Sequence, residues 1–222
     1  MARIKNSLLD GFSGKVGDIV GCMHKSGFYI RRRPARSTKP PTVKQLAQRQ
    51  KFKLAQAFLS GLRELFKTLP DVGEKQTYAY ASAVSHFVKQ AITGEFPEQS
   101  IDYASVKLTT GLLHRGCEHS VRAEPDSLNF SWCRGKQDCL YQDLAVVLAY
   151  SPLTGQWIYQ IVTVGAGCRT AKLNLPFYFQ GDQLETWLYF FSFNGESVSN
   201  SVYTGTHLIP MGAELPDDPL PT

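Results

Sequence analysis

The spacing of the apolar residues changes near Ile101, and this change constrains the fold more than any other feature of the sequence. After it, apolar and polar residues alternate, as in "SLNFSWC" at 127–133, where Leu128, Phe130 and Trp132 fall on one face. Eight short runs of this kind, separated by Gly, Pro, Asp and Asn, predict an all-β sandwich over residues 99–212. The predicted strands cover 105–113, 119–124, 127–133, 140–151, 156–164, 168–175, 184–195 and 197–209.

Residues 42–98 have the three- and four-residue spacing of helices instead. A run that starts at Thr42, a good N-cap, contains no proline before Pro70, and its apolar stripe predicts one long helix. A second helix is expected over about 75–93, with Gly94 as its C-cap. We expect the two to pack as an antiparallel helical hairpin, which makes the fold class α+β.

Residues 1–41 predict a Gly-rich β hairpin arm followed by a stiff Arg-Pro spacer. Two apolar runs flank "HKSG" at 24–27, which is typical of a hairpin turn. The dense glycines match neither a GxGxxG fingerprint nor a Walker motif, so they indicate close backbone approach or bulges. Three prolines keep "PARSTKPP" at 34–41 extended. At the other end, residues 213–222 are expected to form a flexible tail.

The charges are unevenly distributed along the chain. The net charge is +5, but residues 1–67 hold 15 Lys and Arg against 3 Asp and Glu, a net charge of +12, whereas the rest carries −7. A basic N-terminal part on an acidic body suits a protein that binds nucleic acid, or one that docks against the acidic half of a neighbouring copy.

The segment "GFYIRRRPARSTKPP" at 27–41 supplies the candidate contacts for a partner or polyanion. Along a strand, Arg31 and Arg33 share one face while Arg32 points to the other, so the three arginines do not form one phosphate clamp. Alternatively, these charges solubilise an exposed arm and discourage edge-to-edge aggregation. The candidate contact residues are Tyr29, Arg31, Arg33 and Arg36 of the arm, extended by Arg49 and Lys53 of the first helix.

The cysteines and histidines do not predict a catalytic or metal site. Five cysteines, an odd number without CxxC spacing, predict neither a disulfide framework nor a zinc site, and no cofactor is expected. Cys133 and Cys139 bracket a short loop, and whether they pair is left open. "HRGCEH" at 114–119 holds three potential ligands, but a turn at Gly116 is favoured there. Because no GxSxG, HExxH, paired-carboxylate or kinase signature is present, we expect no enzyme.

The N-terminal sequence and the hydropathy indicate where the protein is located. No run of eighteen apolar residues predicts a transmembrane helix, and "MARIKNSLLDGFSGKVG" lacks the apolar core of a signal peptide. We therefore expect a cytoplasmic protein without membrane insertion, or a virion-associated one if the protein is related to phage proteins.

The predicted sandwich resembles fibronectin type III and immunoglobulin-like domains. Trp132 lies in an early strand, as the core tryptophan of those domains does, and "WLYFFSFNGESVSNS" at 187–201 is similar to their penultimate strand and the turn after it. This resemblance implies a binding or scaffold module more readily than an enzyme.

A second resemblance is carried by longer motifs. The stretches "MARIKNSLLDGFSGKVGDIVG" (1–21), "YIRRRPARSTKPPT" (29–42) and "QLAQRQKF" (45–52) resemble a Bacteroidetes family with a domain of unknown function, and the resemblance extends through "SVSNSVYTGT" at 197–206. Ser7 stands where the family pattern has Gly, and Asp18 where it often has Asn. The family implies no activity or site residues. The order of "GKVGDIVG", "GFYIRRRP" and "TVKQLAQRQKF" is also similar to some phage-encoded structural proteins.

Together these features favour a non-enzymatic structural or assembly protein, or a protein-interaction module. Its arm would contact a neighbouring subunit or a partner protein, in a phage- or prophage-related setting if the last resemblance holds. Two alternatives stay open. The first is a nucleic-acid-binding protein that uses the same basic segment, and the second is an enzyme with a site between the helices and the sandwich.

Overall fold

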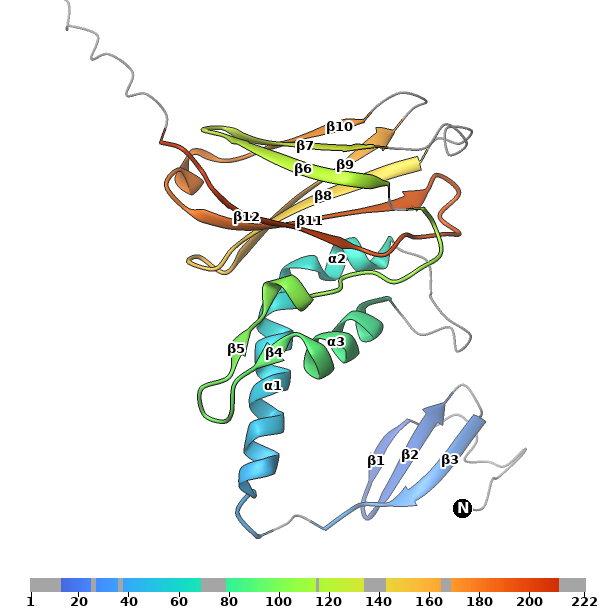
Figure 1. The fold of residues 1–222 in the computed structure, drawn as a ribbon. Helices are drawn as coiled ribbons and strands as arrows, with labels where there is room; N and C mark the ends of the chain where they lie inside the picture. The colour runs from blue at the N-terminus through green and yellow to red at the C-terminus, as the bar shows by residue number, and fades with distance from the viewer. Residues whose placement is uncertain are drawn as a thin grey trace, which may run out of the picture. The chain divides into compact units, whose positions relative to one another are not determined.

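A computed structural model describes residues 13–24, 27–35, 38–68, 79–114, 116–133, 143–164 and 169–211 of the 222-residue chain (Figure 1). The chain divides into two compact units, Met1–Thr42 and Val43–Thr222. The described residues lie mostly in β-sheets, with one helical segment, as the sequence predicts at this level. The predicted tail at 213–222 lies outside the described residues.

The described part of the first unit is a three-stranded antiparallel sheet. Its strands are β1 (Gly14–Val16), β2 (Ile19–His24) and β3 (Gly27–Arg32), in that order. The sequence pattern predicts one apolar run over 16–23, whereas the structure divides it between β1 and β2. The turn between them contains Gly17, whose φ of +58° is a conformation that glycine adopts without steric strain.

Seven strands among the described residues of the second unit form two antiparallel sheets. The smaller sheet has the order β10–β7–β6 and the larger one the order β12–β11–β8–β9 (Figure 1). The strands are β6 (Cys117–Glu124), β7 (Ser127–Cys133), β8 (Asp143–Ser151), β9 (Gln156–Val164), β10 (Thr170–Asn174), β11 (Gln183–Ser192) and β12 (Val202–Leu208). A short 3-10 helix, η4 (Phe177–Phe179), connects β10 to β11.

One apolar core joins the two sheets of the second unit. Leu128, Phe130 and Trp132 of β7 are all buried in it, on the shared face that their alternation predicts. The indole of Trp132 meets the ring of Phe190 edge-on, with the ring centroids 5.2 Å apart. Ala145, Val147 and Ala149 of β8 belong to the same core.

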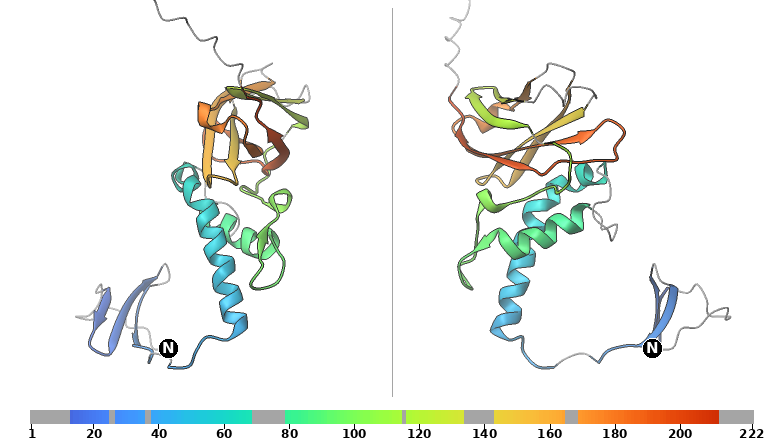
Figure 2. Two further views of the ribbon diagram at one scale, coloured as in Figure 1. Left: turned by 90° about the vertical axis from the view of Figure 1, so that its left-hand side faces the viewer. Right: turned by 45° about the vertical axis from the view of Figure 1, so that its right-hand side comes forward.

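The helical segment packs on the other face of the larger sheet (Figures 1 and 2). It consists of α1 (Val43–Leu59), the 3-10 helix η1 (Ser60–Leu62), α2 (Arg63–Lys67) and α3 (Ala79–Gln90). A second core unites buried side chains of these helices with side chains of β8 and β11. Its members include Phe58, Leu62, Phe87, Val146, Leu148, Trp187 and Tyr189.

Strand β8 is therefore buried on both faces. Its odd-numbered residues from Ala145 to Ala149 belong to the core between the sheets, and Val146, Leu148 and Tyr150 belong to the core under the helices. A strand covered on both sides is apolar throughout instead of alternating, which explains the continuous apolar run "LAVVLAY".

The long first helix predicted from the sequence is interrupted at Gly61. A Cβ atom at this position would lie 2.9 Å from Cδ1 of Trp157 on β9, so glycine allows the chain to pass close to the indole. Trp157 Nε1 also donates a hydrogen bond to the carbonyl oxygen of Phe58, at 2.6 Å. Both contacts fix the end of α1 on the larger sheet.

Residues 105–113, which the alternation predicts as a strand, form no strand in the structure. They come after the short strands β4 (Ile92–Thr93) and β5 (Ser100–Ile101), and their first residue, Ser105, ends the 3-10 helix η2 (Tyr103–Ser105). The alternation is real, because Val106 and Leu108 are buried. However, the backbone N–H groups at 108 and 109 donate to Ser201 Oγ, and that at 111 donates to Asn200 Oδ1. Side chains thus accept the hydrogen bonds of these three N–H groups, whereas the N–H of Leu113 donates to the backbone carbonyl oxygen of Val198 in an isolated β-bridge.

Candidate interaction surface

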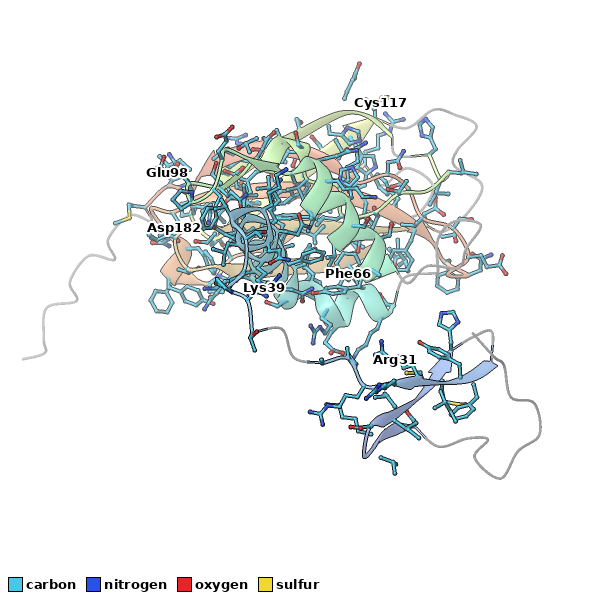
Figure 3. The ribbon with its side chains drawn as sticks, turned by 90° about the horizontal axis from the view of Figure 1, so that it is seen from below. Arg31, Lys39, Phe66, Glu98, Cys117 and Asp182 are labelled. Atoms are coloured by element: carbon cyan, nitrogen blue, oxygen red, sulfur yellow. The ribbon has the colours of Figure 1, made fainter. Side chains whose placement is uncertain are left out.

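Strand β3 carries its two arginines on opposite faces of the first unit's sheet. Antiparallel partners point to the same side, so Arg31 shares a face with Val20, whereas Arg32 shares the other face with Ile19. Both arginines are exposed, and Figure 3 shows Arg31 projecting from the sheet. Tyr29 lies on the same face as Arg31 and is half-buried.

The face of the sheet that carries Arg32 also exposes large apolar side chains. Val16 is 64% exposed, Ile19 46% and Met23 61%. Ile19 lies opposite Val16 on one side and opposite Arg32 on the other, so these three residues form a row across all three strands. We call Val16, Ile19, Met23 and Arg32 the arm face. It combines apolar area with one positive charge at its edge.

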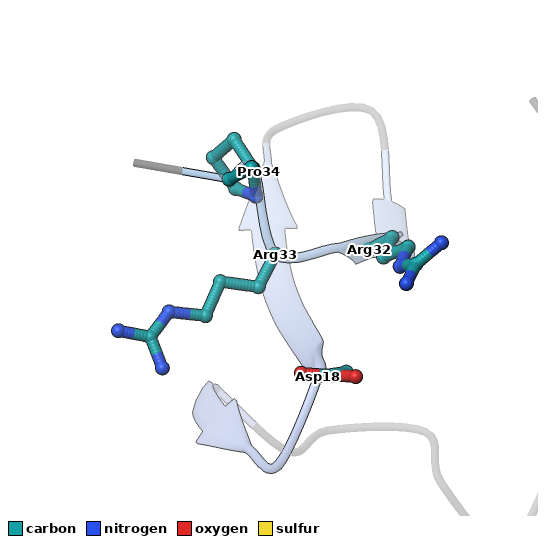
Figure 4. Close-up of a pocket in the computed structure, with 5 residues that line it drawn as sticks. Asp18, Arg32, Arg33 and Pro34 are labelled. Carbon is teal, nitrogen blue, oxygen red and sulfur yellow. The ribbon is translucent and has the colours of Figure 1, made fainter. Parts of the chain in front are cut away.

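The end of β3 forms a pocket with the turn between β1 and β2. The backbone N–H of Arg33 donates to the carbonyl oxygen of Asp18, at 2.7 Å. The pocket has a volume of about 520 Å³, and its lining residues are Asp18, Arg32, Arg33, Pro34 and Ala35. Figure 4 shows the side chains of Arg32 and Arg33 extending in different directions. The two guanidinium groups therefore do not converge on one anion.

The remaining predicted contact residues are distributed elsewhere. Arg33 is exposed just beyond the end of β3, and the face that it shares with Arg31 stays a prediction. Arg36 lies outside the described residues. Arg49 and Lys53 are exposed on α1, one helical turn apart. They belong to the second unit, so a continuous basic patch with the arm stays a prediction.

A buried carboxylate lies under the helical segment. Glu185 of β11 is 7% exposed, and it accepts hydrogen bonds from Tyr203 Oη at 2.5 Å and from Thr206 Oγ1 at 3.0 Å. Burial, with smaller contributions from Tyr150, Glu185 and Tyr203, raises the pKa of Tyr103 to about 12. The carboxylate thus joins β11 to β12, and the nearby Tyr103 is protonated at neutral pH.

The last three residues of "HRGCEH", Cys117, Glu118 and His119, begin β6. Its register places Cys117 opposite Cys133 of β7, a pairing that the sequence analysis did not consider. Among the described residues, no group of three or more His, Cys, Asp and Glu side chains is arranged to hold a metal ion. Cys139, the sequence-based candidate partner of Cys133, lies outside the described residues.

The arm face is the part of the surface that the sequence analysis missed. The basic residues can be read directly from the sequence. Which of Arg31 and Arg32 belongs to the arm face, however, depends on which of them lies beside the exposed apolar residues. The register between β1 and β2 decides this, and it follows from the position of the turn at Gly17. Recognising that turn in "GKVGDIVG" would have placed Val16 and Ile19 on one face.

The fold and this surface define a mostly β-sheet protein with one helical segment and a basic N-terminal sheet. The chain belongs to a family of unknown function, DUF6266, whose model matches residues 11–205. A family of unknown function was also what the N-terminal motifs indicated. The matched range covers most of both units.

Other comparisons add little to this assignment. One solved structure that matches is the solution structure of the fn3 domain of human collagen alpha-1(XX) chain, at 19% identity and a TM-score of 0.33, covering 47% of this chain and 91% of that chain. A search of curated proteins found no match. Within the described residues, no helix has both the length and the apolar content that are needed to cross a membrane.

Proposed function

We propose that the protein is a non-enzymatic structural or assembly protein whose arm face docks onto a second copy of the same chain. The observation that supports this proposal is the exposure of Val16, Ile19 and Met23 on a small sheet. Isolated small sheets gain stability by covering an apolar face, and an apolar patch with a charged edge is typical of a protein–protein contact.

The charge distribution favours a second copy as the partner. Residues 1–42 hold 9 Lys and Arg against 2 Asp and Glu, a net charge of +7, residues 43–67 add +5, and residues 68–222 carry −7. Opposite charges on the two parts of one chain attract copies to one another and set their orientation. A head-to-tail contact of this kind forms closed rings or open arrays, depending on whether the rotation closes. A phage- or prophage-related assembly is one setting in which such arrays are used.

Sedimentation velocity of the full chain, at about 50 mM and about 500 mM NaCl, tests the proposal because salt screens exposed charges. We expect oligomers at the lower salt concentration that dissociate at the higher one. Deleting residues 1–40 should give a monomer in both. A monomer in both buffers, unchanged by the deletion, would contradict the proposal.

A matched pair of variants separates docking through the arm face from general charge attraction. Arg32→Glu and Arg31→Glu change the net charge equally and lie next to each other on β3, but only Arg32 belongs to the arm face. We expect Arg32→Glu to weaken association at least about tenfold, because it places a carboxylate beside buried apolar area, and Arg31→Glu to act much less. Met23→Gln should weaken association by about 1–2 kcal/mol through lost apolar burial. Equal effects of both charge reversals would argue against the arm face.

We also infer that the two sheets of the second unit form a sandwich of the immunoglobulin and fibronectin type III kind. The strand order supports this inference, because the chain crosses between the sheets after β7, after β9 and again after β10. Two facing antiparallel sheets with crossing connections and a core tryptophan on an early strand are typical of such domains. These domains serve as interaction modules, which agrees with the proposed assembly role.

A second candidate function is nucleic-acid binding through the basic segment. Its support is that Arg31, Arg32 and Arg33 are all exposed. Binding through several phosphates should lose affinity with a log–log salt slope of roughly −0.9 per contact on duplex DNA. Fluorescence anisotropy with labelled DNA and RNA at about 50 mM NaCl is the test. If neither DNA nor RNA binds at this salt concentration, nucleic-acid binding is excluded as the function. The sedimentation experiment would still test the proposed docking onto a second copy.

A further inference from the structure

Two cysteines face each other where β6 begins. Cys117 lies directly opposite Cys133 in the β6–β7 register, and both are free thiols. The Sγ atom of Cys117 is 3.5 Å from the carbonyl oxygen of Cys133. Cys117 is exposed and lies at the periphery of the second unit in Figure 3. We propose that Cys117 and Cys133 form a disulfide bond under oxidising conditions, which makes this end of the smaller sheet a redox-sensitive site.

The backbone geometry supports this pairing. Directly opposite residues of antiparallel strands have Cβ atoms about 4.5–5.5 Å apart, and a disulfide needs about 3.5–4.5 Å, so only a small adjustment is required. A β-bulge between Cys117 and Ser120, with Glu118 at a φ of +49°, lies next to the pair. A bulge is irregular backbone whose dihedral angles can absorb such an adjustment without disturbing the ladder beyond it.

The charges around the pair indicate which of the two thiols reacts first. Cys133 Sγ donates a hydrogen bond to Glu118 Oε2 at 3.2 Å, and this carboxylate raises the pKa of the Cys133 thiol. Cys117 contributes in the same direction and Arg169 in the opposite one, so both lie close to Cys133. Because Glu118 disfavours the thiolate of Cys133, the exposed Cys117 is the thiol that reacts first with an external oxidant.

With oxidised glutathione as the oxidant, the reaction balances in two exchange steps. The Cys117 thiolate attacks one sulfur of glutathione disulfide and expels one glutathione thiolate, which takes up a proton. The Cys133 thiolate then attacks Cys117 Sγ in the mixed disulfide and expels the second glutathione. In total, two protein thiols lose two electrons and two protons, and one glutathione disulfide becomes two glutathione molecules.

The bond would tie the edge strand β6 to the central strand β7 at the end remote from their connecting turn. It would also secure the chain segment that enters β6, because a Cβ atom at Gly116 would lie 3.0 Å from the carbonyl oxygen of Cys133. A cross-link between residues 16 positions apart restricts the unfolded chain, and it should raise the melting temperature of the full chain by several degrees.

Peptide mapping distinguishes this pair from every other pairing of the five cysteines. Trypsin cleaves after Arg115, Arg122 and Arg134, so Cys117 lies on peptide 116–122 and Cys133 on peptide 123–134. Cys139 and Cys168 share peptide 137–169, and Cys22 lies on 16–25. After equilibration of the full chain with glutathione and alkylation, we expect 116–122 linked to 123–134. A predominant link between 123–134 and 137–169 would overturn the proposal.

Three further measurements test whether Cys117 and Cys133 form this bond. The double variant Cys139→Ser and Cys168→Ser should form the bond unchanged, whereas Cys117→Ser should abolish it. The effective concentration of the two thiols should be at least about tenfold higher in the folded chain than in urea, and by linkage the bond should stabilise the fold by the same factor. An effective concentration that is lower in the folded chain than in urea would show that the fold opposes the bond. Glu118→Gln should accelerate its formation, because it lowers the pKa of Cys133.

Discussion

Replacing Gly111 with Ala tests how the segment between the helices and the sheets is held. A Cβ atom at Gly111 would lie 2.0 Å from the carbonyl oxygen of Val198 and 2.9 Å from its carbonyl carbon. The φ of Gly111 is outside the left-handed region, so the cost is steric and not conformational. Because backbone atoms stand on both sides of this contact, a side-chain rotation cannot relieve it, and one segment must move away from the other.

The magnitude follows from the contacts that such a movement breaks. Gly111 N–H donates to Asn200 Oδ1 at 3.1 Å, and Leu113 N–H donates to Val198 O at 3.1 Å. Losing two hydrogen bonds costs about 1–3 kcal/mol, and overpacking adds about 1–3 kcal/mol. We therefore expect Gly111→Ala to lower the free energy of unfolding by about 4 kcal/mol, which corresponds to a decrease in Tm of roughly 8–16 °C.

Urea denaturation followed by tryptophan fluorescence measures this change. All three tryptophans lie in the second unit, so the signal reports on that unit. Gly195→Ala is the matched control, because Gly195 has a φ of +71° and open space around it, and its replacement should cost about 1–2 kcal/mol. A loss for Gly111→Ala that does not exceed the loss for Gly195→Ala would refute the proposed packing of 106–113 against 198–201.

Two further predictions concern the aromatic residues between the helices and the larger sheet. Trp157→Phe keeps an aromatic ring but removes the hydrogen bond to the carbonyl oxygen of Phe58, so it should cost about 1–2 kcal/mol in the same urea assay, and an unchanged midpoint would contradict it. Because the pKa of Tyr103 is raised from 10.0 to about 12 in the folded state, its contribution to stability is complete below pH 10 and is lost as the pH rises toward 12. Urea unfolding between these pH values should therefore show a decline in stability that is shallower in Tyr103→Phe, and an equally steep decline in the variant would contradict this.

The sequence predicts the kind of structure well where one face of an element is buried and the other is not. Leu128, Phe130 and Trp132 alternate with polar residues because β7 meets a core on one side, and the strand was recognised from that pattern. Residues 105–113 show the limit of the same reasoning. Val106 and Leu108 alternate because the segment is half-buried, but periodicity does not reveal whether the backbone partner is another strand or the side chains of Ser201 and Asn200.

The positive charge of the candidate surface could be predicted from the sequence, but the face of the sheet on which each arginine lies could not. The excess of arginine near Arg31 is plain from composition. Which arginine lies beside exposed apolar area depends on strand register, which pairs Arg32 with Ile19 and Arg31 with Val20. The pairing of the cysteines also depends on strand register. Cys133 is nearer to Cys139 in sequence, but the β-bulge between Cys117 and Ser120 shifts the β6–β7 register by one residue and brings Cys117 opposite Cys133.

Because β8 is buried on both faces, the β-sheet region depends on the helical segment to stay folded and soluble. A sheet whose outer face is polar can be separated from its neighbours without exposing apolar side chains to water. Here the outer surface of the larger sheet carries Val146, Leu148, Trp187 and Tyr189, which belong to the core that the sheet shares with the helices. A fragment cut at residue 99 would present these side chains to water and aggregate. Deletions in the helical segment should therefore be tolerated as poorly as deletions in the sheets.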